Sequence, residues 1–320
     1  MIEIYPEDCL DSEKKIKDNS VDLGIFDPPF GIGESSFNKH YNRIKNNVIQ
    51  GYQEAPKDYE NWTLLWLTEA KRVLKPNGSI YIIIGHTNLR DVLNAAHKLN
   101  LYQVNHCIWK YNFGVSTKKK FVTSHYHILY YTKSENSERT FNVNCRFGFH
   151  EKDQKEGSLL YQDLEDVFYI KKQYAANEIK NQNKLPEELI RKIIQYSSNQ
   201  GDVVCDFFMG NFTTAYTAIK LGRKVCGYEI NKNSYDYHIN KIKSITFGCD
   251  LENLKKVENI VPANQGKKIE TIEIQSICED FKNMINQKIT KKQAIVNLQN
   301  KYGRGKFSIQ NIIKNHFQAK

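Results

Sequence analysis

The chain has 320 residues, 40% of them hydrophobic and 26% charged, and a formal net charge of +10. This composition is ordinary for a globular protein with one large core, and it excludes a disordered chain. No apolar run is long enough to span a membrane, and the N-terminus does not resemble a signal peptide. The positive surplus fits a polyanionic partner, although a solvated basic surface would give the same number.

The chain contains seven cysteines and no Cys-x-x-Cys pair. An odd count without paired spacing favours reduced thiols, which are typical of the cytoplasm. We therefore expect a cytoplasmic protein.

Short apolar runs alternate with amphipathic stretches along the first 132 residues. The runs have strand length, and the stretches have the three- and four-residue spacing of helices. The sequence predicts strands over 2–5, 21–26, 79–85, 104–109 and 126–132. It predicts helices over 8–17, 59–74 and 88–99. A loop is predicted over 31–59 and a turn over 75–78. This alternation is typical of a mainly parallel sheet that helices cover on both faces.

The alternation stops between residues 133 and 183, a polar, charged and aromatic segment without a clear period. We interpret this segment as an irregular insert. Beyond it the sequence predicts helices over 186–196, 213–221 and 234–242, and strands over 203–205 and 224–228. The predicted fold class is α/β, with a Rossmann-like sheet of seven mostly parallel strands.

The end of the chain is its most basic part. Residues 267–320 hold eleven Lys or Arg and four Asp or Glu, a balance of +7 that leaves +3 for the first 266 residues. The pattern predicts a linker over 245–268 and two short helices over 290–300 and 308–317. These helices form either a basic unit like a helix-turn-helix or a pair packed on the main domain.

The tetrapeptide Asp27-Pro28-Pro29-Phe30 directly follows the strand predicted over 21–26. Open α/β sheets place their active sites at the carboxyl ends of strands, so this acid lies where a catalytic group is expected. The prolines stiffen the backbone and offer carbonyl acceptors, and Phe30 adds a flat ring. Together they suit the binding of a flat base through its amino group. A polar turn after a strand is the plainer alternative.

A second constellation runs strand, tight loop, helix, strand and acid. The loop begins at Asp206, the helix at Thr213, and Glu229 follows the second strand. An acid at this last position suits the hydroxyl groups of a ribose. Glu229 could also simply cap its strand.

These motifs resemble those of the DNA amino-methyltransferases that use S-adenosylmethionine. Asp27-Pro28-Pro29-Phe30 matches that family's catalytic motif, and the segment 206–214 resembles its cofactor loop. Further segments that resemble family signatures lie at 67–78, 124–133, 184–186 and 201–202. The catalytic motif precedes the cofactor loop, which is the permuted order of the beta group. The resemblance covers about residues 1–245.

The resemblance implies a methyltransferase fold in four parts. They are a catalytic half over 1–132, a target-recognition insert over 133–183, a cofactor-binding half over 184–245, and a linker with a basic helical extension over 246–320.

The resemblance also implies roles for the matched residues. Asp27 and the Pro28 carbonyl would bind the target amino group, and Phe30 would stack on the flipped base. The implied catalytic residues are Asp27, Pro28, Pro29 and Phe30. The implied cofactor-binding residues are Asp8, Cys9, Asp206, Phe208, Gly210, Asn211, Thr213 and Glu229.

Among the cofactor-binding residues, Asp206 and the backbone of Phe208 and Gly210 would hold the methionine part of the cofactor. Glu229 would bind its ribose, and Asp8 and Cys9 would lie near its adenine. For Asp8, the cap of a helix over 8–17 is an equal alternative. No metal is expected, because His125 and His127 lack a third ligand at a suitable spacing.

The cofactor loop departs from the family pattern at two positions, where Phe207 replaces a proline and Phe212 replaces a glycine. If that glycine served a positive φ, Phe212 would be strained. If it served close approach of the cofactor, Phe212 would crowd the site.

The predicted function is site-specific methyl transfer from S-adenosylmethionine to the amino group of a flipped base in double-stranded DNA. The acid at the first motif position favours adenine N6 over cytosine N4, and the absence of a Pro-Cys pair disfavours cytosine C5 chemistry. The alternatives are a DNA-binding subunit with an inactive cofactor site and a methyltransferase for RNA or a protein amide. The resemblance leaves room for a cognate restriction endonuclease as partner and fits a monomer or homodimer.

Overall fold

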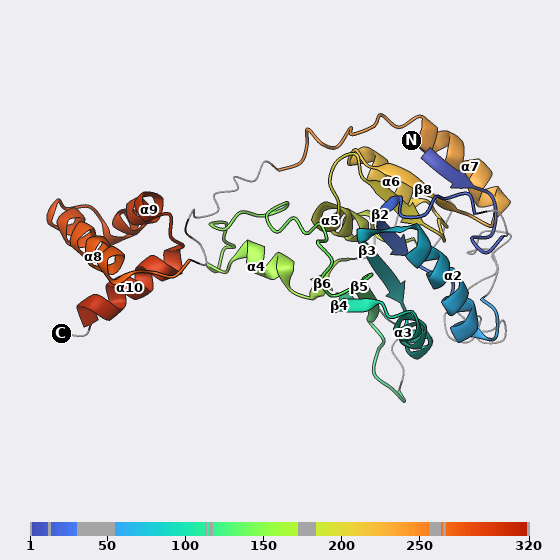
Figure 1. The fold of residues 1–320 in the computed structure, drawn as a ribbon, viewed down its shortest axis with the longest axis horizontal. Helices are drawn as coiled ribbons and strands as arrows, with labels where there is room; N and C mark the ends of the chain where they lie inside the picture. Colours follow the sequence, from blue (N-terminus) through green and yellow to red (C-terminus); the bar gives the residue numbers. More distant parts are fainter. Residues whose placement is uncertain are drawn as a thin grey trace. The chain divides into compact units, whose positions relative to one another are not determined.

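The computed structural model describes residues 2–11, 14–30, 55–112, 114, 118–171, 184–255, 264 and 267–318. Most of the predicted loop over 31–59 therefore lies outside the described residues. By its contacts the chain divides into two compact units, one of residues 1–147 and 152–257, the other of residues 148–151 and 258–320. Figure 1 labels most of the elements of both units. Among the described helices, none has the length and apolar character to cross a membrane.

The first unit is built on a mixed sheet whose described part has eight strands, in the order β1-β8-β7-β2-β3-β5-β4-β6. The strands are β1 (Ile2–Tyr5), β2 (Val21–Phe26), β3 (Leu74–Ile84), β4 (Tyr102–Lys110), β5 (His125–Thr132), β6 (Val167–Tyr169), β7 (Val203–Asp206) and β8 (Lys224–Tyr228). Only the pairs that involve β5 are antiparallel. The predicted α/β class with a mostly parallel sheet is confirmed.

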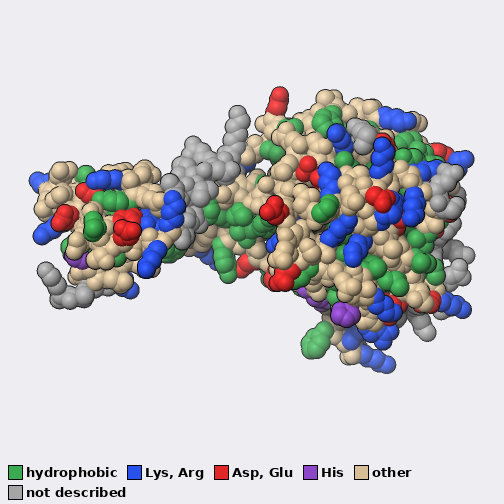
Figure 2. Space-filling model, in the orientation of Figure 1, with side chains coloured by type: hydrophobic (Ala, Val, Ile, Leu, Met, Phe, Trp, Pro, Cys, Tyr) green, Lys and Arg blue, Asp and Glu red, His purple; other side chains and the backbone are tan. Residues whose placement is uncertain are grey.

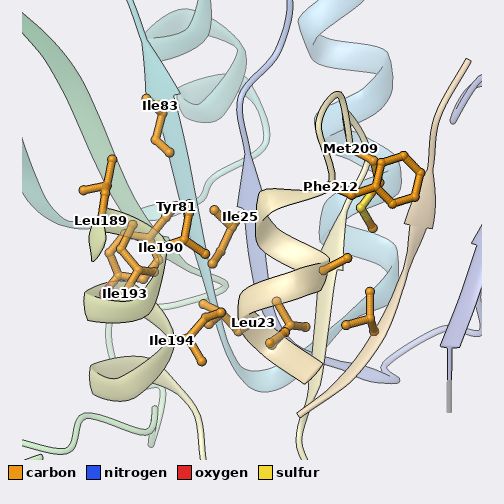
Figure 3. Packing of buried hydrophobic residues seen from close by; sticks show 14 of the residues in the cluster. Leu23, Ile25, Tyr81, Ile83, Leu189, Ile190, Ile193, Ile194, Met209 and Phe212 are labelled. Atoms are coloured by element: carbon orange, nitrogen blue, oxygen red, sulfur yellow. The ribbon is translucent and has the colours of Figure 1, made fainter. Parts of the chain in front are cut away.

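Helices cover both faces of this sheet. Their bounds are α2 (Tyr59–Val73), α3 (Leu89–Lys98), α4 (Leu159–Leu164), α5 (Glu187–Ser197), α6 (Thr213–Lys220) and α7 (Lys232–Lys243). One face packs against α2 and α3, and the other against α5, α6 and α7, which gives two buried clusters. Figure 3 shows part of the second cluster, where Ile190 and Ile193 of α5 face Ile25 and Tyr81 of the sheet.

The insert over 133–183 has more order than its composition predicts. It contains α4 and the eighth strand, β6, which pairs in parallel with β4. Asp163 fastens it to α5, because its carboxylate accepts a hydrogen bond of 2.6 Å from the hydroxyl of Tyr196 on that helix. Within the insert, the same carboxylate accepts from Arg146 at 2.9 Å. Lys192 of α5 lies 3.4 Å from the same carboxylate. Residues 172–183 lie outside the described part.

Two local predictions in the first unit are wrong. The described part of 8–17 forms turns and no helix, because the Asp8 carboxylate accepts from the Leu10 amide at 2.9 Å and so closes a local turn. The segment 75–78 is not a turn that precedes a strand. It lies inside β3, where the register with β2 jumps between the Val21–Leu74 and Leu23–Ser79 pairs.

The second unit contains three helices in its described part, α8 (Thr271–Asn286), α9 (Lys291–Tyr302) and α10 (Lys306–Gln318). The last two match the predicted helices, whereas α8 was not predicted. Ile277 and Cys278 of α8, Leu298 of α9 and Ile309 of α10 are buried together in a core of the unit's own.

Phe212 has an unusual backbone for a bulky residue. It caps the N-terminus of α6 with φ 58° and ψ 23°, in the left-handed region. Its ring is fully buried and stacks on His238 of α7, with 5.1 Å between ring centroids and 23° between planes. Phe212 is therefore strained, as expected if the family's glycine serves a positive φ, and its ring fills the core under α6.

Because Phe212 is both strained and part of the core, the relative stabilities of two Phe212 variants can be predicted. Phe212→Ala loses about 3–5 kcal/mol of core packing and keeps the strain. Phe212→Gly loses the same packing but relieves roughly 1–2 kcal/mol of backbone strain. In urea unfolding we expect the wild type to be the most stable, then Phe212→Gly, then Phe212→Ala. An alanine variant as stable as the glycine variant would contradict the strained backbone.

Candidate active site

The candidate site lies at the carboxyl edge of the sheet, between β7 and β2. The crossover from β7 to β8 runs through α6 on one face, whereas that from β2 to β3 runs through α2 on the other. The strand order therefore reverses direction between β7 and β2, and in open α/β sheets ligands bind at such a switch point. Asp206 ends β7 and Asp27 follows β2, so the two acids flank this point.

The tetrapeptide 27–30 leaves β2 with its prolines packed and its acid and ring partly exposed. Pro28 is buried, whereas Asp27 and Phe30 are half-buried. The Pro29 carbonyl accepts a hydrogen bond of 3.1 Å from the hydroxyl of Tyr59, at the start of α2. The motif also contains the Asp27 carboxylate and the Pro28 carbonyl, which are hydrogen-bond acceptors of the kind that suits an amino group.

Phe30 belongs to an aromatic group at the same edge. Its ring centroid is 5.6 Å from that of Tyr126, which in turn lies 5.5 Å from Trp109 and 5.3 Å from Tyr111. These rings come from the first residues of β5 and the last of β4. A flat ligand that reaches Asp27 would therefore find aromatic surface beside it.

The cofactor-type loop starts from a buried carboxylate. Asp206 is 4% exposed, and its carboxylate accepts from the Phe208 amide at 2.9 Å. Burial raises the pKa of Asp206 to about 6, although hydrogen bonds from Thr214 and the Phe208 amide oppose the shift. Phe208 is half-buried and Phe207 lies in the core, with its ring centroid 5.0 Å from that of Phe26.

Glu229, directly after β8, holds the same loop from the neighbouring strand. Its two carboxylate oxygens accept from the backbone amides of Gly210 at 2.5 Å and Asn231 at 2.8 Å. Burial raises the pKa of Glu229 to about 7, these two bonds lower it, and the charge of Asp206 raises it further. Glu229 therefore does more than cap a strand, because it ties the loop to the start of α7.

Two glycines shape the loop. Gly227 on β8 pairs with Asp206 at φ 151°, and a Cβ there would lie 1.8 Å from the Asp206 carbonyl oxygen. This close approach seats Asp206 against β8. Gly210 adopts φ 50° and is exposed, and a Cβ on it would meet no atom closer than 3.7 Å. A side chain at Gly210 would thus enter open space, and the Gly210 amide is the group that binds Glu229.

The remaining predicted cofactor residues lie at the same edge with different exposure. Asn211 is half-buried and Thr213 is buried at the start of α6. Asp8 and Cys9 follow β1, the neighbour of β8. Cys9 is 7% exposed within the core cluster of α2 and α3, and burial raises the pKa of its thiol well above the ordinary value.

Two aromatic residues of α2 connect the two halves of the site. The hydroxyl of Tyr59 holds Pro29, and its ring centroid is 5.3 Å from that of Trp62. Trp62 in turn lies 5.6 Å from Phe208 of the cofactor-type loop. The helical spacing of Tyr59 and Trp62 was visible in the sequence, but the contact between Tyr59 and Pro29 was not.

His127, which alternates with His125 along β5, makes a hydrogen bond within the sheet. Its Nδ1 lies 2.9 Å from Nε2 of His106 on β4. Burial, and then the neighbouring histidines, lower the pKa of His127 to about 4. Within the described residues no group of three or more His, Cys, Asp or Glu side chains is arranged to hold a metal ion.

Comparison with known proteins identifies the family. The model of the N6/N4 methyltransferase family, described as "DNA methylase", matches residues 21–241, more than half of the chain. Type II methyltransferase M.BamHI of Bacillus amyloliquefaciens is 31% identical over 247 residues, which cover 71% of this chain and 54% of that protein. The chain thus matches about half the length of this relative.

Another relative, DNA adenine methyltransferase YhdJ of Escherichia coli, is 28% identical over 83% of this chain and 91% of its own length.

Solved structures agree on the fold. The PvuII DNA methyltransferase, described as cytosine-N4-specific, superposes with a TM-score of 0.55 at 14% identity, over 80% of this chain and 94% of that one. The complex of M1.HpyAVI with S-adenosylmethionine gives a TM-score of 0.52 at 19% identity, over 77% and 100%. The chain therefore belongs to the N6/N4 DNA methylase family, the S-adenosylmethionine-dependent DNA amino-methyltransferases, with the motif order of the beta group.

Proposed function

We propose that this chain methylates the N6 amino group of adenine at specific sites in double-stranded DNA. The observation that carries the proposal is the parallel pairing of β2 with β7, which brings the segment that starts at Asp27 to the same sheet edge as the loop held by Asp206 and Glu229. One side of the junction offers acceptors for an amino group, and the other offers buried acids for a cofactor.

Asp27 and the Pro28 carbonyl accept the two hydrogens of the target amine. The lone pair of an exocyclic amine is conjugated into its ring, so these two acceptors localise it toward the methyl donor as attack begins. Asp27 then takes the proton that the methylated amine releases. A general base typically accelerates a reaction by about 10²–10⁴-fold, and the positioning of the two reactants supplies the remaining rate enhancement.

The residues present fit S-adenosylmethionine. Glu229 suits the ribose hydroxyls, Asp206 and the amides of Phe208 and Gly210 suit the methionine part, and Asp8 and Cys9 lie on the adenine side. The open space beside Gly210 leaves room for a ligand at the acids. When bound, the cofactor supplies an electrophilic methyl group on a sulfonium.

The target base leaves the duplex to reach Asp27, and Phe30 with Tyr126 offers it a surface on which to stack. Stacking on aromatic side chains is worth about 1–3 kcal/mol per base and offsets part of the unstacking cost. The aspartate at the first motif position favours adenine, and the relative YhdJ is a DNA adenine methyltransferase. Cytosine N4 is the alternative.

A DNA-binding subunit with an inactive cofactor site was the competing function. That alternative would require Phe212 to crowd the cofactor, whereas the ring of Phe212 lies in the core against His238. A cognate restriction endonuclease remains a proposed partner. The seven cysteines are all free, which supports a cytoplasmic enzyme.

Replacing Asp27, the proposed general base, should abolish most of the methyl transfer and leave the fold intact. We expect Asp27→Ala to lower methyl transfer to mixed-sequence duplex DNA by roughly 10²–10⁴-fold, because no other group in the motif can accept the proton. Transfer of labelled methyl groups measures this, and calorimetry with S-adenosylmethionine should give the wild-type affinity. Glu252→Ala, at an exposed acid of the same unit, is the control. Near wild-type turnover of Asp27→Ala would refute the catalytic assignment.

Removing the Tyr59 hydroxyl should loosen the catalytic motif without touching the cofactor. We expect Tyr59→Phe to slow methyl transfer by about tenfold, since small misplacements of reacting groups are costly. Single-turnover rates test this, with Tyr131→Phe, buried in the same cluster, as control. A rate equal to that of the wild type would show that the bond to Pro29 does not position the motif.

The raised pKa values make cofactor binding depend on pH. Ribose hydroxyls donate best to ionised carboxylates, and burial raises the pKa of Glu229 to about 7 and that of Asp206 to about 6. Affinity for S-adenosylmethionine should therefore rise from pH 6 to pH 8, by about tenfold for the Glu229 part.

In the absence of ligand, the stability of the folded protein depends on pH in the opposite direction. The folded protein holds these protons more tightly than the unfolded chain, so its stability falls as pH rises from the ordinary pKa of a carboxyl toward 7. Calorimetry at three pH values on the wild type and Glu229→Gln tests the binding part. The variant should show a flatter profile, and a wild-type affinity that falls with pH would contradict the role of these acids.

A further inference from the structure

The C-terminal unit has the construction of an independent folding unit. Each of α8, α9 and α10 packs against the other two, and their apolar residues form a closed core. The family match ends at residue 241, before all three of these helices begin. Nothing in the proposed chemistry uses any of its residues.

The connection between α9 and α10 is a tight three-residue turn, Gly303-Arg304-Gly305. Gly303 ends α9 in the left-handed conformation, with φ 59°. Two helices joined by three or four residues with a glycine are the pattern of a helix-turn-helix, in which the second helix enters the major groove of DNA.

Arg304 fixes this turn. Its guanidinium is 5% exposed and donates to both carboxylate oxygens of Glu273 on α8, at 2.8 and 2.7 Å. It also donates to the carbonyls of Asn264 and Lys267, at 2.7 and 2.6 Å. Arg304 is thus a structural cation, and α10 is presented on a rigid support.

The outward face of α10 carries an exposed phenylalanine, Phe307, together with amide and lysine side chains, which are types that can bind base edges. Ile309, Ile312 and Ile313 point into the core. On the other side, Gln310 is half-buried and Asn311, Lys314 and Asn315 are exposed, at the three- and four-residue spacing of one helix face. Gln and Asn pair with adenine edges and Lys with guanine or phosphate, mostly from the N-terminal half of a recognition helix.

The charge of the unit complements a polyanion. Residues 267–320 carry eleven basic and four acidic residues. Of the basic ones, Arg304 is paired with Glu273 and Lys301 with Asp280. Lys288, Lys291 and Lys292 are exposed around the start of α9, where the first helix of such a motif crosses the phosphate backbone. The visible face of the unit carries basic side chains along its edge (Figure 2).

We propose that α8, α9 and α10 form a second binding unit for duplex DNA, in which α10 reads the major groove through Gln310, Asn311 and Lys314, and the lysines at the start of α9 contact phosphates. The proposal rests on DNA as the substrate of the chain. It adds that part of the sequence recognition lies outside the methyltransferase fold, beside the methylated site.

The test uses the full chain with the Asp27→Ala background, so that binding is measured without turnover. Duplexes are selected from a random library, and the enriched sequences should contain two blocks, one at the methylated site and one beside it. Gln310→Ala with Asn311→Ala should erase the second block, with a loss of roughly tenfold or more per base contact. Gln275→Ala with Asn283→Ala, two exposed amides on α8, should leave both blocks unchanged.

The lysines provide an independent readout. Lys288, Lys291 and Lys292 changed together to alanine should weaken binding to all duplexes alike. They should also reduce the slope of log affinity against log salt by about 0.9 for each phosphate that the variant no longer neutralises.

A single enriched block, a second block that survives the change in α10, or RNA that competes as well as DNA would each overturn the proposal. A wild-type chain that methylates DNA while the α10 variants bind unchanged would leave the methyltransferase function intact. A wild-type chain that transfers no methyl group would count against the methyltransferase function. The duplexes selected by the α10 variants would still show whether this unit binds DNA.

Discussion

The pairing of β2 with β7 is the contact on which the site depends. It joins segments about 180 residues apart, with Leu23 opposite Val204 and Gly24 opposite Cys205. The Asp22 side chain reinforces it, since one oxygen accepts from the Val203 amide at 2.9 Å and the other binds Lys75 at 2.7 Å. Because parallel strands end at the same edge, this pairing puts the segment 27–30 at the same sheet edge as the cofactor-type loop, although the two lie far apart in the sequence.

Burial of acids is the second constraint. Asp206 and Glu229 are nearly inaccessible, and backbone amides are their hydrogen-bond partners in the loop they hold. Desolvation raises both pKa values, so the ligand-free site holds its charges at a cost in stability. A ligand with hydroxyl and ammonium donors offsets this cost. The arrangement therefore favours a polar, cationic cofactor over an apolar ligand.

The sequence predicted the strands and loops that carry the candidate site better than it predicted the elements around them. Strand 21–26 and the loop that starts at Asp206 lie where expected, because a short apolar run bounded by turn residues is a strong local signal. The three-residue β6 was missed because so short a strand has no period of its own. The helix over 8–17 failed because the Asp8 side chain competes with the helical backbone for amide donors.

Helix α8 was missed although its apolar residues recur at helical spacing, and only packing against α9 and α10 makes that face a core. The Tyr59 hydroxyl on Pro29 is a tertiary contact between segments 30 residues apart that no local pattern encodes.

The central claim is that the junction of β2 and β7 transfers a methyl group to an amino nitrogen of adenine. The most direct measurement is mass spectrometry of nucleosides from unmethylated duplex DNA incubated with the wild-type chain and S-adenosylmethionine. We expect the wild-type chain to form N6-methyladenine and the Asp27→Ala variant to form none. N4-methylcytosine would contradict the choice of base, and 5-methylcytosine or an unmodified DNA would contradict the chemistry assigned to Asp27.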